Sequence, residues 1–230
     1  MATLEQVLPR IHRLRLGRIN CYLITGPSPV VVDCGLPAHA DRVLDAMPRV
    51  GIERTRLAAI LLTHRHLDHA GGAAKVSAAT GARVVIHAAD HAAIVGAERL
   101  SPLRGRLDLT LGPLVSFFDR RVFRFRPCPR AEAAPDGWEE LGVRLIHLPG
   151  HTPGHSAFLH LESGAVLCGD AAMSGEHGPR LPSRLFSLDP DAVRRSLHRL
   201  AGLDAPVYCF GHGPPLLSGS PALRHLAAAV

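Results

Sequence analysis

The chain has 230 residues, a length at which one α/β domain can bury a full hydrophobic core. Hydrophobic residues make up 47% of it, and its 22 glycines and 19 prolines indicate a compact protein with many turns, which excludes a disordered chain. No apolar stretch approaches the roughly 20 residues needed to cross a bilayer, and the N-terminal residues lack a basic region followed by an apolar one. We therefore expect neither a membrane span nor a signal peptide.

Five cysteines and a net charge of +6 indicate the redox environment of the protein and the charge of its surface. The cysteines form an odd set with no C-x-x-C pair, so we expect free core thiols in a cytoplasmic protein. They are Cys21, Cys34, Cys128, Cys168 and Cys209. The positive charge comes mainly from scattered arginines, and we interpret its one denser patch as a solvated face. That patch consists of Arg120, Arg121, Arg124, Arg126 and Arg130.

The first half of the chain alternates between predicted strands and helices. Strands are expected over residues 11–16, 19–25, 30–33, 57–62 and 83–86, and helices over residues 39–47, 72–79 and 88–95. The run from Val30 to Asp33 has the β-branched character of a central strand that delivers an acid to its C-terminal end. Alternation of this kind is typical of an α/β layer fold.

The alternation stops between residues 96 and 135, a stretch rich in Arg, Pro and Leu. We predict that it is a lid or an insertion, with a strand near residues 122–125, within one domain that spans residues 1–230. Strands are then expected over residues 143–148, 156–161, 165–168 and 206–210. Asp189 and Pro190 are the predicted N-cap and first residue of a helix to Leu203, and a short helix is expected in the tail.

Four potential metal ligands lie within six residues, directly after the apolar run 57–62. They are His64, His66, Asp68 and His69. A carboxylate among three imidazoles suits a hydrophobic core poorly, because buried charge needs a partner. It suits a borderline metal such as zinc, which accepts both histidine nitrogen and aspartate oxygen. The stretch therefore predicts half of a metal site at the end of a buried strand, with Leu67 pointing away from it.

Three later strands also end in candidate ligands that are flanked by glycine and proline. The strand over 143–148 leads into P-G-H-T-P-G-H with His151, the next candidate is Asp170 in G-D, and the last is His212 in G-H-G. Ligands at strand ends converge on one edge of an open sheet. We therefore expect these side chains to complete the site that the first cluster begins.

The motifs T-H-x-H-x-D-H, G-H-T-P-G-H-S, G-D and G-H-G, in this order, resemble those of the metallo-β-lactamase superfamily. The resemblance implies an α/β fold, a four-layer αββα sandwich with a two-metal site along one edge. By position, the first metal would be bound by His64, His66 and His151, the second by Asp68, His69 and His212, and both by Asp170. The resemblance also implies that Asp33 orients a ligating histidine.

The implied chemistry is hydrolysis by a metal-bridging hydroxide. Two divalent ions a few ångströms apart lower the pKa of a bridging water from about 15.7 toward 7. Attack of that hydroxide on an electrophilic carbonyl or phosphorus needs no covalent enzyme intermediate. Asp68 and Asp170 are the predicted catalytic residues, which hold the hydroxide and accept its proton. Zinc is the expected metal, and the same ligand set also suits iron or manganese.

Departures from known branches of the superfamily restrict the substrate. Asp170 stands where the best-known zinc β-lactamases have Cys or Ser, which argues against antibiotic hydrolysis. The ligand set resembles that of glyoxalase II, but only residues 213–230 follow His212, too few for the helical glutathione-binding domain of that family. Acyl-homoserine lactonases are close in length, but the tyrosine that follows their bridging Asp has no counterpart here.

We therefore predict a binuclear metallo-hydrolase, glyoxalase II-like or lactonase-like, that cleaves a small-molecule thioester, ester or lactone. The alternatives are a phosphodiesterase or nuclease of the same fold, a mononuclear iron enzyme resembling persulfide dioxygenases, and a non-catalytic metal-binding module. No exosite arm is identifiable, which disfavours nucleic acid as a partner despite the positive charge. The Arg-Thr-Asp segment of persulfide dioxygenases is absent after Asp170. The sequence indicates no oligomeric state.

The other histidines and the pocket carry weaker signals. His155 matches the family motif and is expected to brace its loop, whereas His177 is a candidate to face the substrate. The candidate walls of the substrate pocket are Phe117, Phe118, Met173 and Phe186. The remaining histidines are assigned to surface or hydrogen-bonded positions: His12, His39, His87, His91, His147, His160, His198 and His225.

Overall fold

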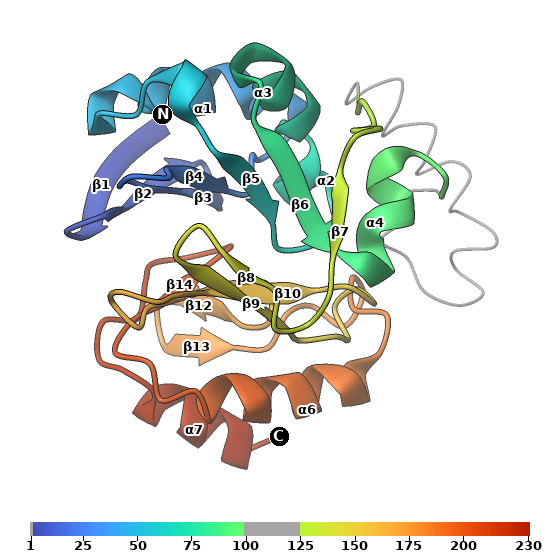
Figure 1. Ribbon diagram of the computed structural model, residues 1–230. Coiled ribbons are helices and arrows are strands. Elements are labelled where there is room, and N and C mark those ends of the chain that lie inside the picture. The colour runs from blue at the N-terminus through green and yellow to red at the C-terminus, as the bar shows by residue number, and fades with distance from the viewer. Residues whose placement is uncertain (1, 99–124) are drawn as a thin grey trace.

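The computed structural model describes residues 2–98 and 125–230. Its elements form four layers, helix, sheet, sheet and helix, in which each sheet has one face toward the other sheet and one face toward helices (Figure 1). The predicted αββα sandwich is confirmed. The predicted domain limits, residues 1–230 as one unit, stay a prediction.

The first sheet has seven strands in the order β1-β2-β3-β4-β5-β6-β7. They are β1 (Ala2–Leu8), β2 (Ile11–Leu16), β3 (Ile19–Ile24), β4 (Val30–Val32), β5 (Ala59–Leu62), β6 (Arg83–His87) and β7 (Glu132–Ala134). The strands from β1 to β4 are antiparallel neighbours, whereas β4, β5, β6 and β7 run parallel. The C-terminal ends of β4 and β5 therefore lie side by side, and the first ligand cluster follows β5.

Helices and short turns cover the outer face of this sheet. They are α1 (Ala40–Ala46), α2 (Leu67–Ala70), α3 (Ala73–Thr80) and α4 (Ala88–Val95), with 3-10 turns η1 (Pro37–His39), η2 (Pro48–Val50) and η3 (Arg54–Arg56). The helix predicted over 39–47 is thus shorter, because Pro37 opens a separate 3-10 turn. The helix predicted over 88–95 is confirmed.

The second sheet has five strands in the order β14-β11-β10-β9-β8. They are β8 (Glu139–Glu140), β9 (Val143–His147), β10 (Ser156–His160), β11 (Val166–Gly169) and β14 (Tyr208–Phe210), and a separate hairpin consists of β12 (Met173–Gly175) and β13 (Gly178–Arg180). Strands β11 and β14 are parallel neighbours. The residues that follow these two strands, Asp170 and His212, are thereby brought to one edge.

Two helices cover the outer face of the second sheet, α6 (Pro190–Ala201) and α7 (Pro221–Ala228). Asp189 caps α6 as predicted, since its Oδ1 accepts hydrogen bonds of 3.0 Å from the backbone amides of Asp191 and Ala192. The buried face of α6, with Leu197 and Leu200, shares the outer core with Ala157 of β10 and Val166 of β11. A short terminal helix was predicted, and α7 confirms it.

Three layers of apolar side chains hold the sandwich together. Strand β4 shows how the sequence divides them, because side chains alternate between the two faces of a strand. Val31 packs into the core beneath the helices, whereas Val30 and Val32 pack into the core between the sheets. All five cysteines are buried and form no disulfide, which confirms the predicted free thiols.

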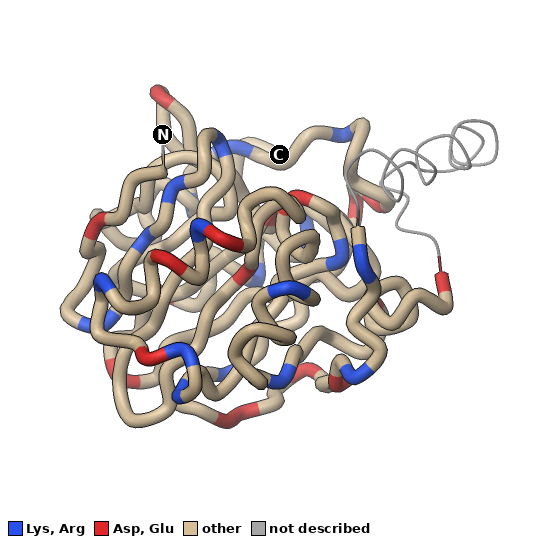
Figure 2. The backbone as a smooth tube through the Cα atoms, turned by 90° about the horizontal axis from the view of Figure 1, so that it is seen from above, with Lys and Arg blue, Asp and Glu red and all other residues tan. Residues whose placement is uncertain are grey.

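The segment predicted as a lid or insertion ends in the sheet. Its residues Glu132–Ala134 form β7, which pairs with β6 in parallel. The predictions for Phe117, Phe118 and the strand beginning at residue 122 fall in 99–124, outside the described residues, as does most of the arginine patch. Over the described residues, basic and acidic positions are interspersed (Figure 2). None of the described helices is long and apolar enough to cross a membrane.

Candidate metal centre

The site begins where β4 and β5 end. Asp33 follows β4 and its carboxylate accepts hydrogen bonds from both the backbone amide of Thr63 (2.9 Å) and the Thr63 hydroxyl (2.8 Å). Thr63 Oγ1 lies 3.0 Å from Nδ1 of His64. Because the hydroxyl proton goes to Asp33, Oγ1 accepts from Nδ1, and His64 directs its Nε2 lone pair away from these partners.

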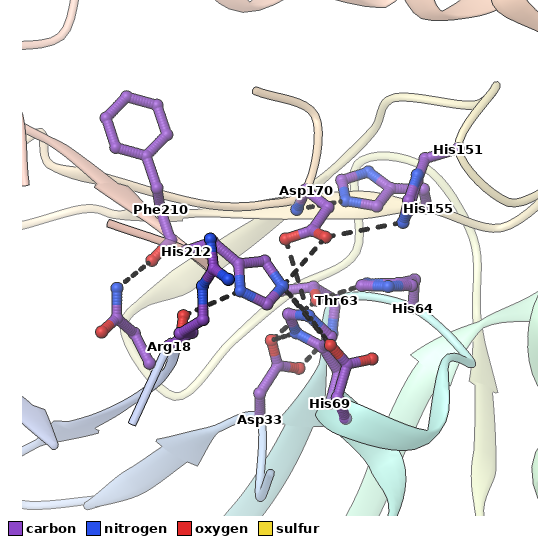
Figure 3. A network of polar contacts seen from close by, with 12 residues as sticks. Arg18, Asp33, Thr63, His64, His69, His151, His155, Asp170, Phe210 and His212 are labelled. Atoms are coloured by element: carbon purple, nitrogen blue, oxygen red, sulfur yellow. Dashed lines mark hydrogen bonds and ion pairs between the residues drawn. The ribbon is translucent and has the colours of Figure 1, made fainter. Parts of the chain in front are cut away.

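His69 is oriented by the same carboxylate (Figure 3). Asp33 Oδ2 lies 2.8 Å from Nδ1 of His69, so Nδ1 carries a proton and Nε2 faces the site. Asp33 is 2% exposed and its φ is +59°, in the left-handed region. Such a conformation in a buried acid at a strand end is typical of a functional position. Asp33 thus orients His69, as the resemblance implied, and the role of His69 as a metal ligand stays a prediction.

The short helix α2 sets the spacing of the first motif. His66 stands at its N-cap position, and Asp68 and His69 lie in its single turn. The following Gly72 packs against the backbone of Cys34, where a Cβ would overlap the carbonyl oxygen. The glycine is therefore required for α2 to approach the end of β4 this closely.

His151 comes from the loop between β9 and β10. Its Nδ1 lies 3.2 Å from Ser187 Oγ, and Ser187 in turn donates to the Ser183 carbonyl at 2.9 Å. Ser187 Oγ therefore accepts from Nδ1, and Nε2 of His151 faces the site. His155, in the same loop, accepts a 2.9 Å hydrogen bond at Nε2 from the backbone amide of Asp170. The ring thus braces the backbone of Asp170, whereas the sequence predicted that it would brace its own loop.

His212 follows β14 and is fixed from the opposite sheet. Its Nδ1 donates to the Arg18 carbonyl at 2.8 Å, so its Nε2 also faces the site (Figure 3). Asn20 holds the flanking backbone by donating to the carbonyls of Phe210 (2.9 Å) and Gly213 (2.6 Å). Four of the five histidines thus have the Nδ1–H tautomer set by a neighbour, which leaves Nε2 available.

The seven predicted ligands converge on one place. Three groups have ligand atoms within 4.8 Å of one another: His64, His66 and His151; His64, His69 and Asp170; Asp68, His69 and His212. Asp170 joins the two ends of the cluster, because its Oδ2 lies 3.6 Å from Nε2 of His151 and 3.3 Å from Nε2 of His212. Two of the three groups are the sets that the resemblance assigned to the first and the second metal, and the third contains residues of both. The division between two metals stays a prediction.

The chemistry of these atoms fits a divalent metal. Nε2 of His64, His66 and His151 and Oδ1 of Asp170 are buried and have no hydrogen-bond partner among the described residues. An unsatisfied buried polar atom costs about 1–3 kcal/mol. A cation bound by three imidazole nitrogens and a carboxylate would satisfy all of them at once.

The electrostatics of the cluster also fit a divalent metal. Burial holds the pKa of His64 and of His66 well below the ordinary value, which keeps both rings neutral. Burial also acts to lower the pKa of His69, but the carboxylates of Asp170, Asp68 and Asp33 outweigh it and raise the pKa to about 9. The protons on His69 therefore balance carboxylates that a bound cation would otherwise balance.

His212 and the two carboxylates form the rest of this charged half. Burial acts to lower the pKa of His212, but Asp170 and Asp68 raise it to about 11. Burial acts to raise the pKa of both acids, and the neighbouring imidazolium groups of His69 and His212 hold it below the ordinary value. Both carboxylates are thus ionised at neutral pH, the state in which they can bind a cation.

A cleft of about 1050 Å³ opens onto the cluster. Ligands His66, Asp68, His151, Asp170 and His212 line it. The predicted wall residues Met173 and Phe186 line it as well. Leu67 contributes to the lining and also packs against the core beneath the helices, as predicted for a side chain that points away from the ligands. His177 is exposed in the β12–β13 turn and does not line the cleft. The predicted non-ligand histidines join none of the three ligand groups.

One supporting residue was missed in the sequence. Asp90 of α4 is fully buried and accepts hydrogen bonds from the Thr152 hydroxyl (2.5 Å), the Gly154 amide (2.9 Å) and the Arg65 amide (3.2 Å). It thereby ties the first motif to the loop of His151. An acid in the first turn of an alanine-rich helix was the available signal, although such a residue also occurs for the helix dipole alone.

Known proteins were compared with the chain. A family model described as the metallo-β-lactamase superfamily matches residues 14–212. The probable metallo-hydrolase YflN of Bacillus subtilis is 29% identical over 235 residues, which cover 90% of this chain and 84% of the relative. A hydroxyacylglutathione hydrolase of Cereibacter sphaeroides is 38% identical over 175 residues, or 76% of this chain and 54% of that protein. The chain thus spans about half the length of the hydroxyacylglutathione hydrolases that it matches.

Solved structures agree with this assignment. A Cronobacter sakazakii metallo-β-lactamase with a HARLDQ motif has a TM-score of 0.73 at 21% identity. The match covers 98% of this chain and 90% of that structure, and at this identity it supports the fold alone. The protein TTHA1623, solved in a di-iron-bound form, has a TM-score of 0.66 at 30% identity, and the match covers 91% of this chain and 92% of TTHA1623. The fold, the ligand cluster and the matched span agree, and the chain belongs to the metallo-β-lactamase superfamily.

Proposed function

We propose that this protein is a binuclear metal-dependent hydrolase that cleaves a thioester, ester or lactone of a small molecule with water. The observation that carries the proposal is the cluster of buried, unpaired Nε2 atoms beside two ionised carboxylates in an open cleft. A structural core would pair these atoms, and a metal site with no role in catalysis would not need the cleft.

The ligands divide into two positions. One ion would be held by His64, His66 and His151, the other by Asp68, His69 and His212, and Asp170 would contact both. When bound, two divalent ions supply a water of lowered pKa and polarise the bond to be cleaved. Zinc suits this donor set best, and iron and manganese are compatible with it.

Asp68 and Asp170 have different surroundings, which gives them different roles. The Asp170 side chain is 7% exposed and lies against Nε2 of both His151 and His212, so it positions groups between the two halves. The Asp68 side chain is 36% exposed and lines the cleft, so it can accept the proton of the attacking water and release it to solvent.

The relatives support the choice of substrate class. Several are named hydroxyacylglutathione hydrolases, a name that denotes hydrolysis of an acyl group from glutathione, and one at 38% identity covers 76% of this chain. A thioester, ester or lactone presents the same electrophilic carbonyl to the cleft. The five buried free thiols support a cytoplasmic location, where thiols stay reduced.

The test combines metal analysis with a substrate panel. The purified protein is analysed for bound metals and assayed with thioesters, lactones, β-lactams and phosphodiesters. We expect two metal ions per chain, hydrolysis of the first two substrate classes, and loss of turnover after chelation with recovery on adding metal. Turnover of phosphodiesters alone, or full activity of the metal-free protein, would refute the proposal. His198→Ala, an exposed histidine outside the site, is the matched control for His66→Ala.

A further inference from the structure

Four arginines line the cleft beside the ligand cluster, Arg13, Arg15, Arg18 and Arg180. Three of them come from β2 and the β2–β3 turn, and the fourth from β13. Among the described residues, the acids in the same lining are Asp68, Asp170 and Glu176. The first two belong to the ligand cluster, so the rest of the cleft has an excess of positive charge.

Arg13 has a structural role. Its Nη2 lies 2.7 Å from Glu5 Oε1, its Nη1 donates to the Gly213 carbonyl at 3.1 Å, and its side chain is only 9% exposed. The charge of this arginine is therefore matched inside the protein. Its guanidinium stabilises the backbone next to His212.

Arg15 lies two residues further along β2, on the same face of the strand as Arg13. Its cross-strand partners are Thr3 on β1 and Asn20 on β3, so neither neighbour carries a charge. Arg15 is exposed and forms no ion pair with any described residue. The same strand thus presents one neutralised arginine and one free arginine to the cleft.

Arg18 is tied to the site through its backbone. Its carbonyl accepts the 2.8 Å hydrogen bond from His212 Nδ1 (Figure 3). Arg18 is exposed, and its guanidinium pairs with no described carboxylate. The β2–β3 turn passes through Gly17 at a φ of +73°. Because the backbone of Arg18 is fixed next to a ligand, its side chain stays at the mouth of the cleft.

Arg180 enters from the other side. It pairs across the β12–β13 hairpin with Met173, and the next residue of β12, Ser174, donates its amide to the His212 carbonyl at 3.0 Å. The guanidinium of Arg180 is exposed and forms no ion pair with the described residues. Glu176 lies in the same lining, so three free cations face one free anion.

From these observations we propose that Arg15, Arg18 and Arg180 form a cationic subsite that binds an anionic group of the substrate. The inference rests on the proposed function and narrows its substrate class to thioesters, esters or lactones that carry an anionic group. Such a substrate would place its carbonyl at the ligand cluster, its apolar part against Met173 and Phe186, and its anionic group at the arginines.

Charge explains why a neutral substrate fits less well. Arg15, Arg18 and Arg180 repel one another at the mouth of the cleft, and Glu176 can offset one of these three charges. An anionic ligand offsets the remaining repulsion, and the arginines raise the local concentration of anions. The guanidinium fork binds carboxylate and phosphate oxygens in pairs, and either group meets this description.

The experiment uses thioesters that share one acyl group and differ only in the end of the thiol part, which is a neutral amide, a carboxylate or a phosphate monoester. The measured quantity is kcat/KM for each anionic thioester divided by kcat/KM for the neutral one. We expect this ratio to favour the anions and to fall about three- to tenfold in each of Arg15→Gln, Arg18→Gln and Arg180→Gln. It should also fall at about 0.5 M salt, because salt screens exposed charges.

Arg49→Gln is the matched control, because Arg49 is exposed, lies in η2 and does not line the cleft. It changes the net charge equally and should leave the ratio as it is in the wild-type protein. The larger of the two anionic ratios identifies the preferred group, carboxylate or phosphate. Two results would refute the subsite. One is a ratio of anionic to neutral kcat/KM near one in the wild-type protein, and the other is an unchanged ratio in the triple variant that combines Arg15→Gln, Arg18→Gln and Arg180→Gln.

A binding measurement separates this inference from the proposed function. Thioether analogues with the same three ends cannot be hydrolysed, and their affinity for the metal-loaded protein is measured by calorimetry. If no thioester is turned over but the anionic thioethers bind more tightly, and the triple variant loses that preference, the hydrolase proposal fails while the subsite stands. Equal binding of all three thioethers refutes the subsite whatever the enzyme hydrolyses.

Discussion

Replacing Asp33 by Asn should weaken the second metal position and leave the fold intact. Asp33 is 2% exposed, and its carboxylate accepts three hydrogen bonds, two from Thr63 and one from His69. Its φ of +59° is one that Asn tolerates better than most residues, so the substitution keeps both the backbone and the volume. Only the number of acceptors changes.

The expected loss of metal affinity follows from the two hydrogen bonds that Oδ2 accepts. One comes from the Thr63 hydroxyl (2.8 Å) and the other from Nδ1 of His69 (2.8 Å). An amide NH₂ at this place cannot accept from His69, so the ring moves its proton to Nε2, the atom that faces the metal position. If the amide turns over instead, the Thr63 N–H loses its acceptor at a cost of about 1–3 kcal/mol. Loss of such an orienting partner lowers metal affinity about 10- to 100-fold, or roughly 1.4–2.7 kcal/mol.

The assay is competition between the metal-free protein and a chromophoric chelator, which reports the two metal affinities in turn. We expect one or both affinities to fall in Asp33→Asn, because His69 and, through Thr63, His64 depend on this carboxylate. Both affinities should stay unchanged in Asp45→Asn, an exposed acid paired with Arg54 outside the site. Circular dichroism checks that each variant is folded. Two unaltered affinities in a folded Asp33→Asn protein would show that this carboxylate does not set the tautomer of His69.

Three further predictions concern packing, pH and metal removal. Gly154→Ala should lower the free energy of unfolding by about 1–3 kcal/mol in urea titrations, because its Cβ would lie 2.6 Å from the Asp90 amide nitrogen, whereas Gly202→Ala meets nothing closer than 3.4 Å and should be tolerated. Burial and the stacked His147 ring lower the pKa of His87 from 6.5 to about 4. Between these two pH values the unfolded chain binds a proton at His87 that the folded chain does not. The free energy of unfolding should therefore fall as the pH drops from 6.5 toward 4. His87→Asn keeps the cap on Ala89 and should shrink the difference in urea midpoint between about pH 7 and about pH 5; an unchanged difference would contradict this linkage. Chelated protein should keep its circular dichroism spectrum and melt at a lower temperature than the metal-loaded form, and a chelated chain that unfolds would disprove that expectation.

The ligand positions were predictable from the sequence because they follow strands. A buried strand can be recognised in the sequence as an apolar run, and the end of the run marks the end of the strand. Neighbouring parallel strands then bring these ends together. That reasoning places Asp33, His64, Asp170 and His212 at one edge from the pattern alone. The division between two metal positions came from the family resemblance, since spacing does not say which histidine faces which ion.

The supporting shell was not predictable in the same way. Asp90 lies 62 positions from Thr152 and 64 from Gly154 in the chain, and only the packing of α4 against the loop reveals the contacts. The Arg18 carbonyl that orients His212 belongs to the backbone and leaves no trace in residue identity. Strand β1 was missed because its residues alternate weakly, with exposed Thr3, Glu5 and Gln6 on an edge.

The metal centre also joins the two sheets, which affects how it works. Its first half follows β5 and its second half follows β9, β11 and β14, so any relative movement of the sheets would separate His64 from His151. Backbone hydrogen bonds already fix that relation, since Ser156 donates to the Thr63 carbonyl and Asn20 donates to the Gly211 carbonyl, both at 2.8 Å. We therefore expect the proposed ligands to be held near one another by the protein itself, unlike those of small domains that fold only around their metal.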